Sequence, residues 1–216
     1  MSLVLYAIAD PLGDPGQHLR EVVEGGLAAI VGDHDGTRLE RRGENLWRYE
    51  RVMEELMDER AIIPARFGSV LTDEPSVCGL LRDRHYELAA TLERVRGAVE
   101  LSVHAGWVED AATAAPDDGT GYMQARLAQH RRAQEVSELL SPLGALARAG
   151  RRRVLPDQSL PVHDAYLVDC DLVEAFTELV HDIDARREEI ELICTGPWPP
   201  YSFARALDDQ RAEVAV

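Results

Sequence analysis

Residues 45–70 read NLWRYERVMEELMDERAIIPARFGSV and join two kinds of hydrophobic spacing in one run. Over residues 45–60 the apolar side chains recur at intervals of three and four, with charged residues between them, which predicts an amphipathic helix. Over residues 62–70, Ile63, Ala65 and Phe67 alternate with the other side chains, which predicts a strand. Pro64 favours the start of that strand or a sheet edge. A helix that runs directly into a strand predicts a protein built from both kinds of element.

The flanking residues extend this pattern over the first half of the chain. Residues 3–9 form a short apolar run closed by turn residues, which is typical of a buried strand. Thr72 or Asp73, followed by Pro75, predicts the start of a helix that ends at Gly97. The other expected elements are a helix over residues 17–31, an edge strand over 37–42 and a half-buried strand over 99–107. This β-α-β-α-β-α-β order predicts a modified ferredoxin-like α+β domain over residues 1–110.

The second half of the chain predicts another α+β domain, over residues 111–216. Residues 109–121 are rich in Ala, Asp and Gly and are expected to form a linker. A long helix is expected over residues 120–149, interrupted at Pro142, with the arginines of residues 148–153 at its solvated end rather than in a docking patch. A small β-α-β unit follows, built from strands at residues 165–168 and 189–195 around a helix that starts near Asp171.

Composition excludes several classes of function. The 216 residues include 39 acidic and 23 basic side chains, a net charge of −16, and every basic residue is Arg. Without lysine there is no Schiff-base amine, no P-loop lysine and no ATP-anchoring lysine of a kinase. The negative charge argues against nucleic acid and anionic membranes as partners. No secretion signal or run of 18 apolar residues occurs, so we expect a soluble cytoplasmic protein without membrane insertion.

The sequence contains no recognisable catalytic or metal-binding constellation. His lies beside Asp at residues 33–35, 163–164 and 181–182. On a helix, neighbouring residues such as 181 and 182 point about 100° apart and do not converge on one metal. Asp33 and Asp35 would converge in an extended segment, but the flanking glycines indicate a surface turn. We therefore expect no enzymatic activity, no metal and no cofactor. The alternative is a small-molecule enzyme or ligand-binding regulator, because fold alone does not decide function. It would need a pocket that joins His104, His163 or residues 33–35 with Arg66.

Two short segments are unusual. Residues 195–203, TGPWPPYSF, contain three prolines in four residues, which pre-order the chain and display Trp198, Tyr201 and Phe203. Such a segment either packs on its own fold or meets a partner, and we favour self-packing, with an interface at its border left open. The second segment is residues 64–70, where Arg66 precedes Phe67. An arginine within a strand is costly to bury without a carboxylate, so a structural ion pair is expected for Arg66.

Taken together, these segments resemble the gas vesicle protein family GvpL/GvpF. The resemblance covers residues 3–204 and is carried by the opening strand, by YERVMEELM at residues 49–57 running into IPARFGSV at 63–70, by residues 166–169 and by the ending TGPWPPYSF. Neither Pro-x-Arg-Phe-Gly nor Gly-Pro-Trp-Pro-Pro-Tyr-Ser-Phe is specific alone. Their joint occurrence about 130 residues apart is a strong signal.

The resemblance implies a minor protein of gas vesicles, the gas-filled protein shells that give cells buoyancy. It implies two α+β domains, the first ferredoxin-like, and no enzymatic activity. The expected partners are the small, very hydrophobic major shell protein and other accessory proteins, while the oligomeric state is not indicated. Five motif residues are expected to contact a partner or support the fold: Arg66, Phe67, Trp198, Tyr201 and Phe203. A strongly acidic protein that covers apolar shell subunits would keep them soluble before assembly.

Overall fold

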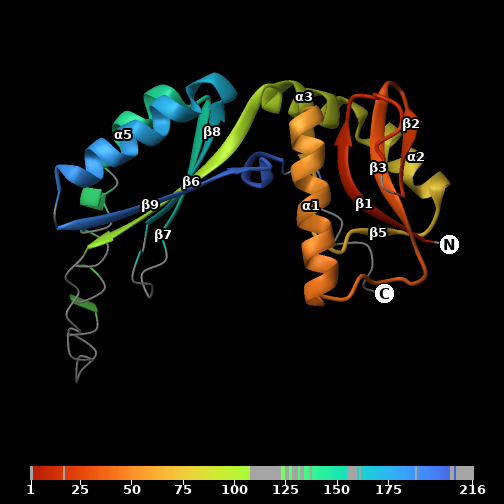
Figure 1. The fold of residues 1–216 in the computed structure, drawn as a ribbon, viewed down its shortest axis with the longest axis horizontal. Helices are drawn as coiled ribbons and strands as arrows, with labels where there is room; N and C mark the ends of the chain where they lie inside the picture. Colours follow the sequence, from red (N-terminus) through yellow and green to blue (C-terminus); the bar gives the residue numbers. More distant parts are fainter. Residues whose placement is uncertain are drawn as a thin grey trace. The chain divides into compact units, whose positions relative to one another are not determined.

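The chain forms an α+β protein with two sheets, as the sequence predicts (Figure 1). This computed structural model describes residues 2–16, 18–107, 123–124, 127, 131, 134–136, 138–154, 160, 162–187, 189–204 and 207. Contacts divide the chain into unit 1, Met1–Ala98 with Pro199–Val216, and unit 2, Val99–Trp198. These limits differ from the expected ranges 1–110 and 111–216. The expected linker at residues 109–121 lies outside the described residues.

The sheet of unit 1 is built around its first strand. The strands are β1 (Ser2–Ala9), β2 (Leu19–Glu24), β3 (Leu27–His34), β4 (Ile62–Pro64) and β5 (Val70–Leu71). The order is β2-β3-β1-β4, with β5 also paired to β1, and every pair is antiparallel. All residues of β1 after Ser2 are buried, which explains the continuous apolar run in the sequence.

The helix expected over residues 17–31 is wrong, because this segment is the hairpin β2–β3. Gly25 and Gly26 connect the strands with φ of 60° and 87°, and a two-residue hairpin turn with positive φ at both positions favours glycine. Val22 and Val23 before this turn, and Ile30 and Val31 after it, then lie in the two paired strands. The edge strand expected over residues 37–42 is also absent from the structure, since β2 already occupies the edge beside β3.

The helices of unit 1 follow the sequence more closely. The amphipathic helix is confirmed as α1 (Gly43–Glu59), which buries Tyr49, Val52, Met53 and Leu56. Helix α2 (Glu74–Asp83) starts as expected, because the Asp73 side chain accepts a hydrogen bond of 2.9 Å from the Ser76 backbone N–H. The single helix expected to run to Gly97 is instead two, since α3 (His85–Val95) begins after Arg84.

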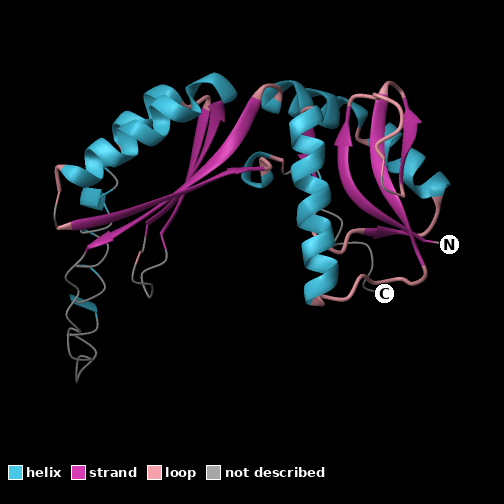
Figure 2. Ribbon diagram, in the orientation of Figure 1, coloured by secondary structure: helices cyan, strands magenta, loops and turns pink. Residues whose placement is uncertain are grey.

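Unit 2 contains a four-stranded sheet with the order β7-β8-β6-β9. Its strands are β6 (Ala98–Trp107), β7 (Ala149–Val154), β8 (Val162–Asp169) and β9 (Ile190–Trp198). All described residues between 123 and 139 are helical. Helix α5 (Val173–Ala185) follows β8 and precedes β9 in the chain, and it runs along the sheet (Figure 2). Short 3-10 helices η1 (Ser141–Leu146) and η2 (Cys170–Leu172) complete the unit.

The ferredoxin-like expectation was placed on the wrong part of the chain. Unit 2 has the β-α-β-β-α-β sequence, and its fourth strand lies beside its first, which is the ferredoxin-like arrangement. Unit 1 instead begins with three consecutive strands, and the described residues between its first two contain no helix. The expected strand at residues 99–107 is confirmed as β6, but it pairs with β9 within unit 2 rather than in a sheet with β1.

The arginine-rich residues 149–154 form strand β7 and not a helix end. Arg152 faces Asp164 across the β7–β8 pair, and Arg148 forms an ion pair with Asp169. Carboxylates on the neighbouring strand therefore hold this arginine run in a sheet. The interruption expected at Pro142 is confirmed by η1. Within the ranges that the structure describes, no helix is both long enough and apolar enough to span a membrane.

Candidate functional site

Tyr49 of α1 is the centre of an aromatic cluster in unit 1. Its side chain is 4% exposed, and its hydroxyl donates a hydrogen bond of 2.5 Å to the carbonyl of Ala65. The ring stacks on Tyr6 of β1, with centroids 5.2 Å apart, and meets Phe67 edge-on at 5.4 Å. The amphipathic pattern of α1 places Tyr49 on the buried face, where it contacts the conspicuous segment at residues 64–70.

Backbone hydrogen bonds hold this segment against β1. The Ala65 N–H donates to the Tyr6 carbonyl at 2.8 Å, and the Leu5 N–H donates to the Ser69 carbonyl at 2.9 Å. Between them the Ser69 N–H donates to the Arg66 carbonyl at 3.1 Å, and Gly68 has φ of 85°, which favours glycine. The strand expected over residues 62–70 is therefore interrupted by a turn. Arg66 is exposed in that turn, so the burial cost that motivated its ion pair does not arise, and the ion pair stays a prediction.

The C-terminal aromatic segment reaches the same cluster. The Tyr201 and Tyr49 hydroxyls share a hydrogen bond. Phe203 is 2% exposed, and Arg94 of α3 donates a hydrogen bond of 2.6 Å to its carbonyl oxygen. Phe203 thus packs within unit 1, while Tyr201 remains 40% exposed. The two motifs, far apart in the sequence, meet around one residue, and we call Tyr6, Tyr49, Phe67 and Tyr201 the aromatic site.

Burial keeps two tyrosines of the aromatic site, Tyr6 and Tyr49, in the neutral form at neutral pH. Burial raises the pKa of Tyr49 far above its ordinary value, and the neighbouring Tyr201 and Tyr6 raise it further. Burial also raises the pKa of Tyr6, although the positive charge of Arg48 opposes this. Tyr6 and Tyr49 are therefore neutral hydrogen-bonding groups with apolar rings.

Two further residues of the motif, Gly196 and Trp198, lie in unit 2. Trp198 ends β9 opposite Glu100, is 47% exposed, and donates through Nε1 to the Thr195 hydroxyl at 3.2 Å. Gly196 has φ of 124°, and a Cβ there would lie 2.8 Å from the Glu100 carbonyl oxygen, so a side chain does not fit. The motif at residues 195–203 is therefore divided, since its first part completes the sheet of unit 2 and its second part packs in unit 1.

Two of the candidate histidines are brought together by unit 2. His104 on β6 and His163 on β8 have ring centroids 4.2 Å apart, and His163 Nε2 lies 2.8 Å from the Leu160 carbonyl oxygen. Burial lowers the pKa of His104, and the neighbouring His163 lowers it further. This is a packed imidazole pair. Across the described residues, no three His, Cys, Asp or Glu side chains are arranged to hold a metal ion.

In each of the three His-Asp segments noted in the sequence, an aspartate contacts an arginine. Asp164 is 4% exposed and accepts hydrogen bonds from Arg152 Nε at 2.8 Å and from the Tyr166 hydroxyl at 2.9 Å. Asp182 pairs with Arg186 one helical turn along α5 at 3.1 Å. Asp33 lies 3.7 Å from Arg20 Nε. Each of these carboxylates lies beside an arginine, and this pairing explains its position without a catalytic role.

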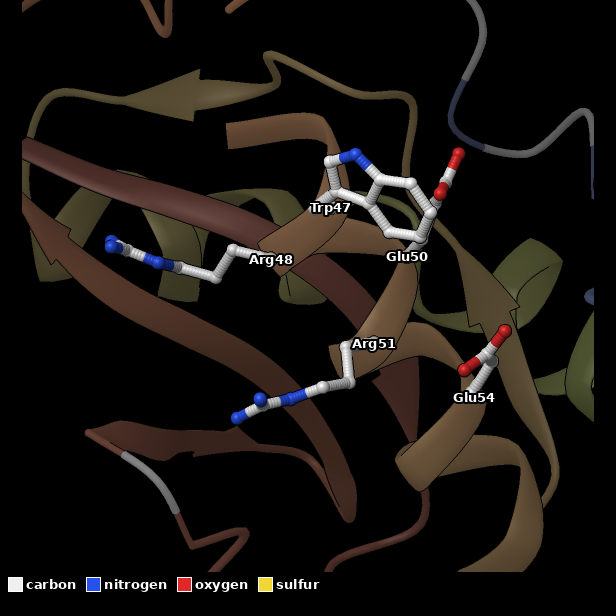
Figure 3. Close-up of a pocket in the computed structure, with 5 residues that line it drawn as sticks. All are labelled: Trp47, Arg48, Glu50, Arg51 and Glu54. Carbon is white, nitrogen blue, oxygen red and sulfur yellow. The ribbon is translucent and has the colours of Figure 1, made fainter. Parts of the chain in front are cut away.

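A hollow of about 440 Å³ lies along the solvent side of α1 (Figure 3). Its described lining consists of Trp47, Arg48, Glu50, Arg51 and Glu54. Sequence reasoning missed Trp47, although an indole on the charged face of an amphipathic helix is itself a signal. It also missed Tyr6 and Tyr49, because the hydrophobic pattern treats a buried tyrosine as one more core side chain.

Comparisons with known proteins agree with the motifs. The family described as gas vesicle synthesis protein GvpL/GvpF matches residues 2–205. Gas vesicle protein F1 of Halobacterium salinarum is 29% identical over 82% of this chain and 76% of its own length. Gas vesicle protein L of a Streptomyces species is 31% identical over 94% of this chain and 88% of its own length.

Solved structures show the same fold. The crystal structure of the gas vesicle protein GvpF from an Anabaena species superposes with a TM-score of 0.78 at 20% identity, covering 94% of this chain and 95% of that one. That of GvpF from Microcystis aeruginosa superposes with a TM-score of 0.77 at 18% identity, covering 94% and 98%. The chain belongs to the GvpL/GvpF family of gas vesicle synthesis proteins, a family of structural and accessory proteins rather than enzymes.

Proposed function

We propose that this protein assists gas vesicle assembly by binding the small hydrophobic major shell protein at the aromatic site. The observation that supports this is the state of Tyr201, which is 40% exposed although it bonds to Tyr49, which is 4% exposed. An exposed ring on a buried framework meets a partner with little further loss of side-chain freedom. Tyrosine is also among the residues that contribute most at protein interfaces.

Phe67 contacts the same Tyr49 that bonds to Tyr201, and Phe67 and Arg66 extend the proposed contact. Phe67 is half-buried against Tyr49, and Arg66 is exposed one residue earlier. Trp198 is a further partner contact, while Phe203 supports the fold. Shell subunits expose apolar surface before they polymerise, and covering it with a protein of net charge −16 opposes aggregation through charge repulsion. We place this activity in the cytoplasm and at the vesicle, with other accessory proteins as further partners.

Co-expression with the major shell protein tests the proposal. The tagged wild-type chain should retain the shell protein on affinity capture and increase its soluble fraction, and Tyr201→Ala should reduce both severalfold. Tyr201→Phe keeps the ring and should bind nearly as well as the wild type. Tyr86→Ala is the matched control, because Tyr86 on α3 is 90% exposed and lies outside the aromatic site.

Two outcomes would count against this function. The first is a wild-type chain that captures no shell protein and leaves its solubility unchanged. The second is an equal loss in Tyr86→Ala and Tyr201→Ala, which would move the contact away from the aromatic site. Thermal unfolding of each variant separates lost binding from lost folding.

A further inference from the structure

Helix α1 presents an aromatic and acidic stripe to solvent, opposite its buried face. Trp47, Glu50 and Glu54 follow one another at intervals of three and four residues, which places them on one side of the helix. Figure 3 shows these three side chains along one side of α1, with Arg48 and Arg51 extending to the other. We call Trp47, Glu50 and Glu54 the α1 stripe, and it borders the hollow of about 440 Å³.

The exposure of Trp47 is unusual for its chemistry. The side chain is 75% exposed, and its neighbour Leu46 is 37% exposed. A tryptophan carries a large apolar surface, and exposed aromatic surface beside polar groups is a common mark of a binding site. The buried face of α1 gains nothing from Trp47, because Tyr49, Val52, Met53 and Leu56 already cover the sheet.

The charges around the stripe are unevenly neutralised. Arg51 Nε lies 3.5 Å from Glu55, so one arginine is paired along its own helix. Arg48 lies close enough to Tyr6 for its charge to act on that hydroxyl. Glu50 and Glu54 form no ion pair with any residue in the described ranges. Among the described residues, these two carboxylates beside the indole are therefore not paired with a cation, although Arg48 and Arg51 also line the hollow.

We propose that the α1 stripe binds an arginine side chain carried by a helix of a partner protein. A guanidinium stacks on an indole face and, at its edge, donates two parallel hydrogen bonds to a carboxylate, a combination that an ammonium group does not match. The stripe follows the i, i+3 and i+7 spacing by which one helix packs against another. This surface and this ligand chemistry are separate from the aromatic site, so the inference stands without the proposed shell-protein contact.

A labelled synthetic helical peptide with two arginines four residues apart provides the probe. Its binding to the full-length protein is measured by fluorescence anisotropy at about 0.05 M and about 0.3 M salt, because exposed charge pairs weaken as salt rises. The same peptide with citrulline in place of arginine keeps the shape and loses the charge. The wild-type chain should bind the arginine peptide more tightly than the citrulline peptide. This difference in affinity should be smaller at high salt.

Variants locate the site. Glu50→Gln with Glu54→Gln should weaken binding about fivefold, since two exposed charge pairs are lost. Trp47→Ala should weaken it about threefold, and Trp47→Phe less, because phenylalanine keeps part of the stacking. The matched control is Glu174→Gln with Glu178→Gln, which removes two exposed carboxylates at the same spacing on α5. That control should bind within about twofold of the wild type.

Three results would overturn the inference. Equal weakening by the α5 control would mean that the net charge of −16 attracts the peptide without a site. Unchanged binding by Trp47→Ala would mean that the indole takes no part in the contact. Self-association of the wild-type chain in sedimentation, lost in Trp47→Ala, would make a second copy the occupant. All three variants leave the buried face of α1 intact, and far-ultraviolet circular dichroism checks this.

Discussion

A buried tyrosine lies in the core of each unit, and the two are satisfied in different ways. Tyr49 in unit 1 donates to a backbone carbonyl and is surrounded by aromatic rings. Tyr166 in unit 2 donates to Asp164, which Arg152 also holds with hydrogen bonds of 2.8 and 2.6 Å. Their exposed fractions are 4% and 5%, so burial does not explain the difference.

We propose that this difference separates a site that meets a partner from one that supports the fold. In unit 1 the Ala65 carbonyl accepts from the buried Tyr49 hydroxyl, the adjoining side chains are aromatic, and Tyr201 is 40% exposed. In unit 2 an ion pair satisfies the hydroxyl and joins β7 to β8 across the sheet. Burial raises the pKa of both tyrosines, and Asp164 raises that of Tyr166 further while Arg152 opposes it. The first arrangement suits a partner, and the second suits stability.

The largest expected effect is on the support beneath the aromatic site. Phe203→Ala should lower the free energy of unfolding by about 3 kcal/mol, because it removes a buried ring and leaves a cavity. Trp198→Ala, in a side chain that is 47% exposed, should cost less than about 1 kcal/mol. Urea unfolding followed by circular dichroism measures both. Equal losses would mean that the two aromatic residues support the fold alike.

Breaking the ion pair of unit 2 should have the next largest effect. Asp164→Asn should cost about 2 kcal/mol, less than a fully buried pair, because the Arg152 side chain is 40% exposed and water screens it. Asp182→Asn is the control at an exposed pair on α5 and should cost less than about 0.5 kcal/mol. Chemical unfolding of each variant gives the values. A similar cost for both would remove the distinction between a buried and an exposed pair.

Removing single hydroxyls compares the two tyrosines directly. Tyr49→Phe should cost about 1.5 kcal/mol, because the Ala65 carbonyl loses this donor inside the core. Tyr166→Phe should cost about 1 kcal/mol or less, since Asp164 keeps its hydrogen bonds to Arg152. Thermal and urea unfolding provide the measurements. The reverse order would show that the charged network depends more on its tyrosine than the aromatic site does.

The smallest expected effect is a pH dependence from the imidazole pair of unit 2. The pKa of His104 is lowered in the folded protein, so the unfolded chain binds more protons as the pH falls through the ordinary value of 6.5. His104 should therefore contribute a loss of stability below that pH, and His104→Gln should flatten the dependence. His181→Gln on the exposed side of α5 is the control. Unfolding midpoints between about pH 5 and 8 test this, and an unchanged slope in His104→Gln would contradict it.

Local sequence patterns predicted the elements whose cause is local. The buried face of α1 follows from helical periodicity, and the start of α2 follows from Asp73, which accepts a hydrogen bond from Ser76. The expected helix over residues 17–31 failed because an alanine-containing apolar run suits a buried strand equally well. The Gly25-Gly26 pair is the local feature that distinguishes a hairpin from a helix here.

The candidate site was predicted in its parts but not in its assembly. Arg66, Phe67, Tyr201 and Phe203 were singled out from two motifs, yet Tyr6 and Tyr49, which join those motifs, have no distinguishing local pattern. The arginines of residues 151–153 were assigned to a helix end because the carboxylate that holds Arg152 lies on another strand.

The sequence by itself determined the family, the α+β class, the buried face of α1 and the residues of both motifs, since each depends on residues close together in the chain. Only the tertiary structure decided which strands share a sheet, so that β6 pairs with β9 and the ferredoxin-like order belongs to unit 2. It also decided that residues 64–70 and 199–203 meet at Tyr49. Pairing between distant segments depends on hydrogen bonds and packing that no local periodicity records.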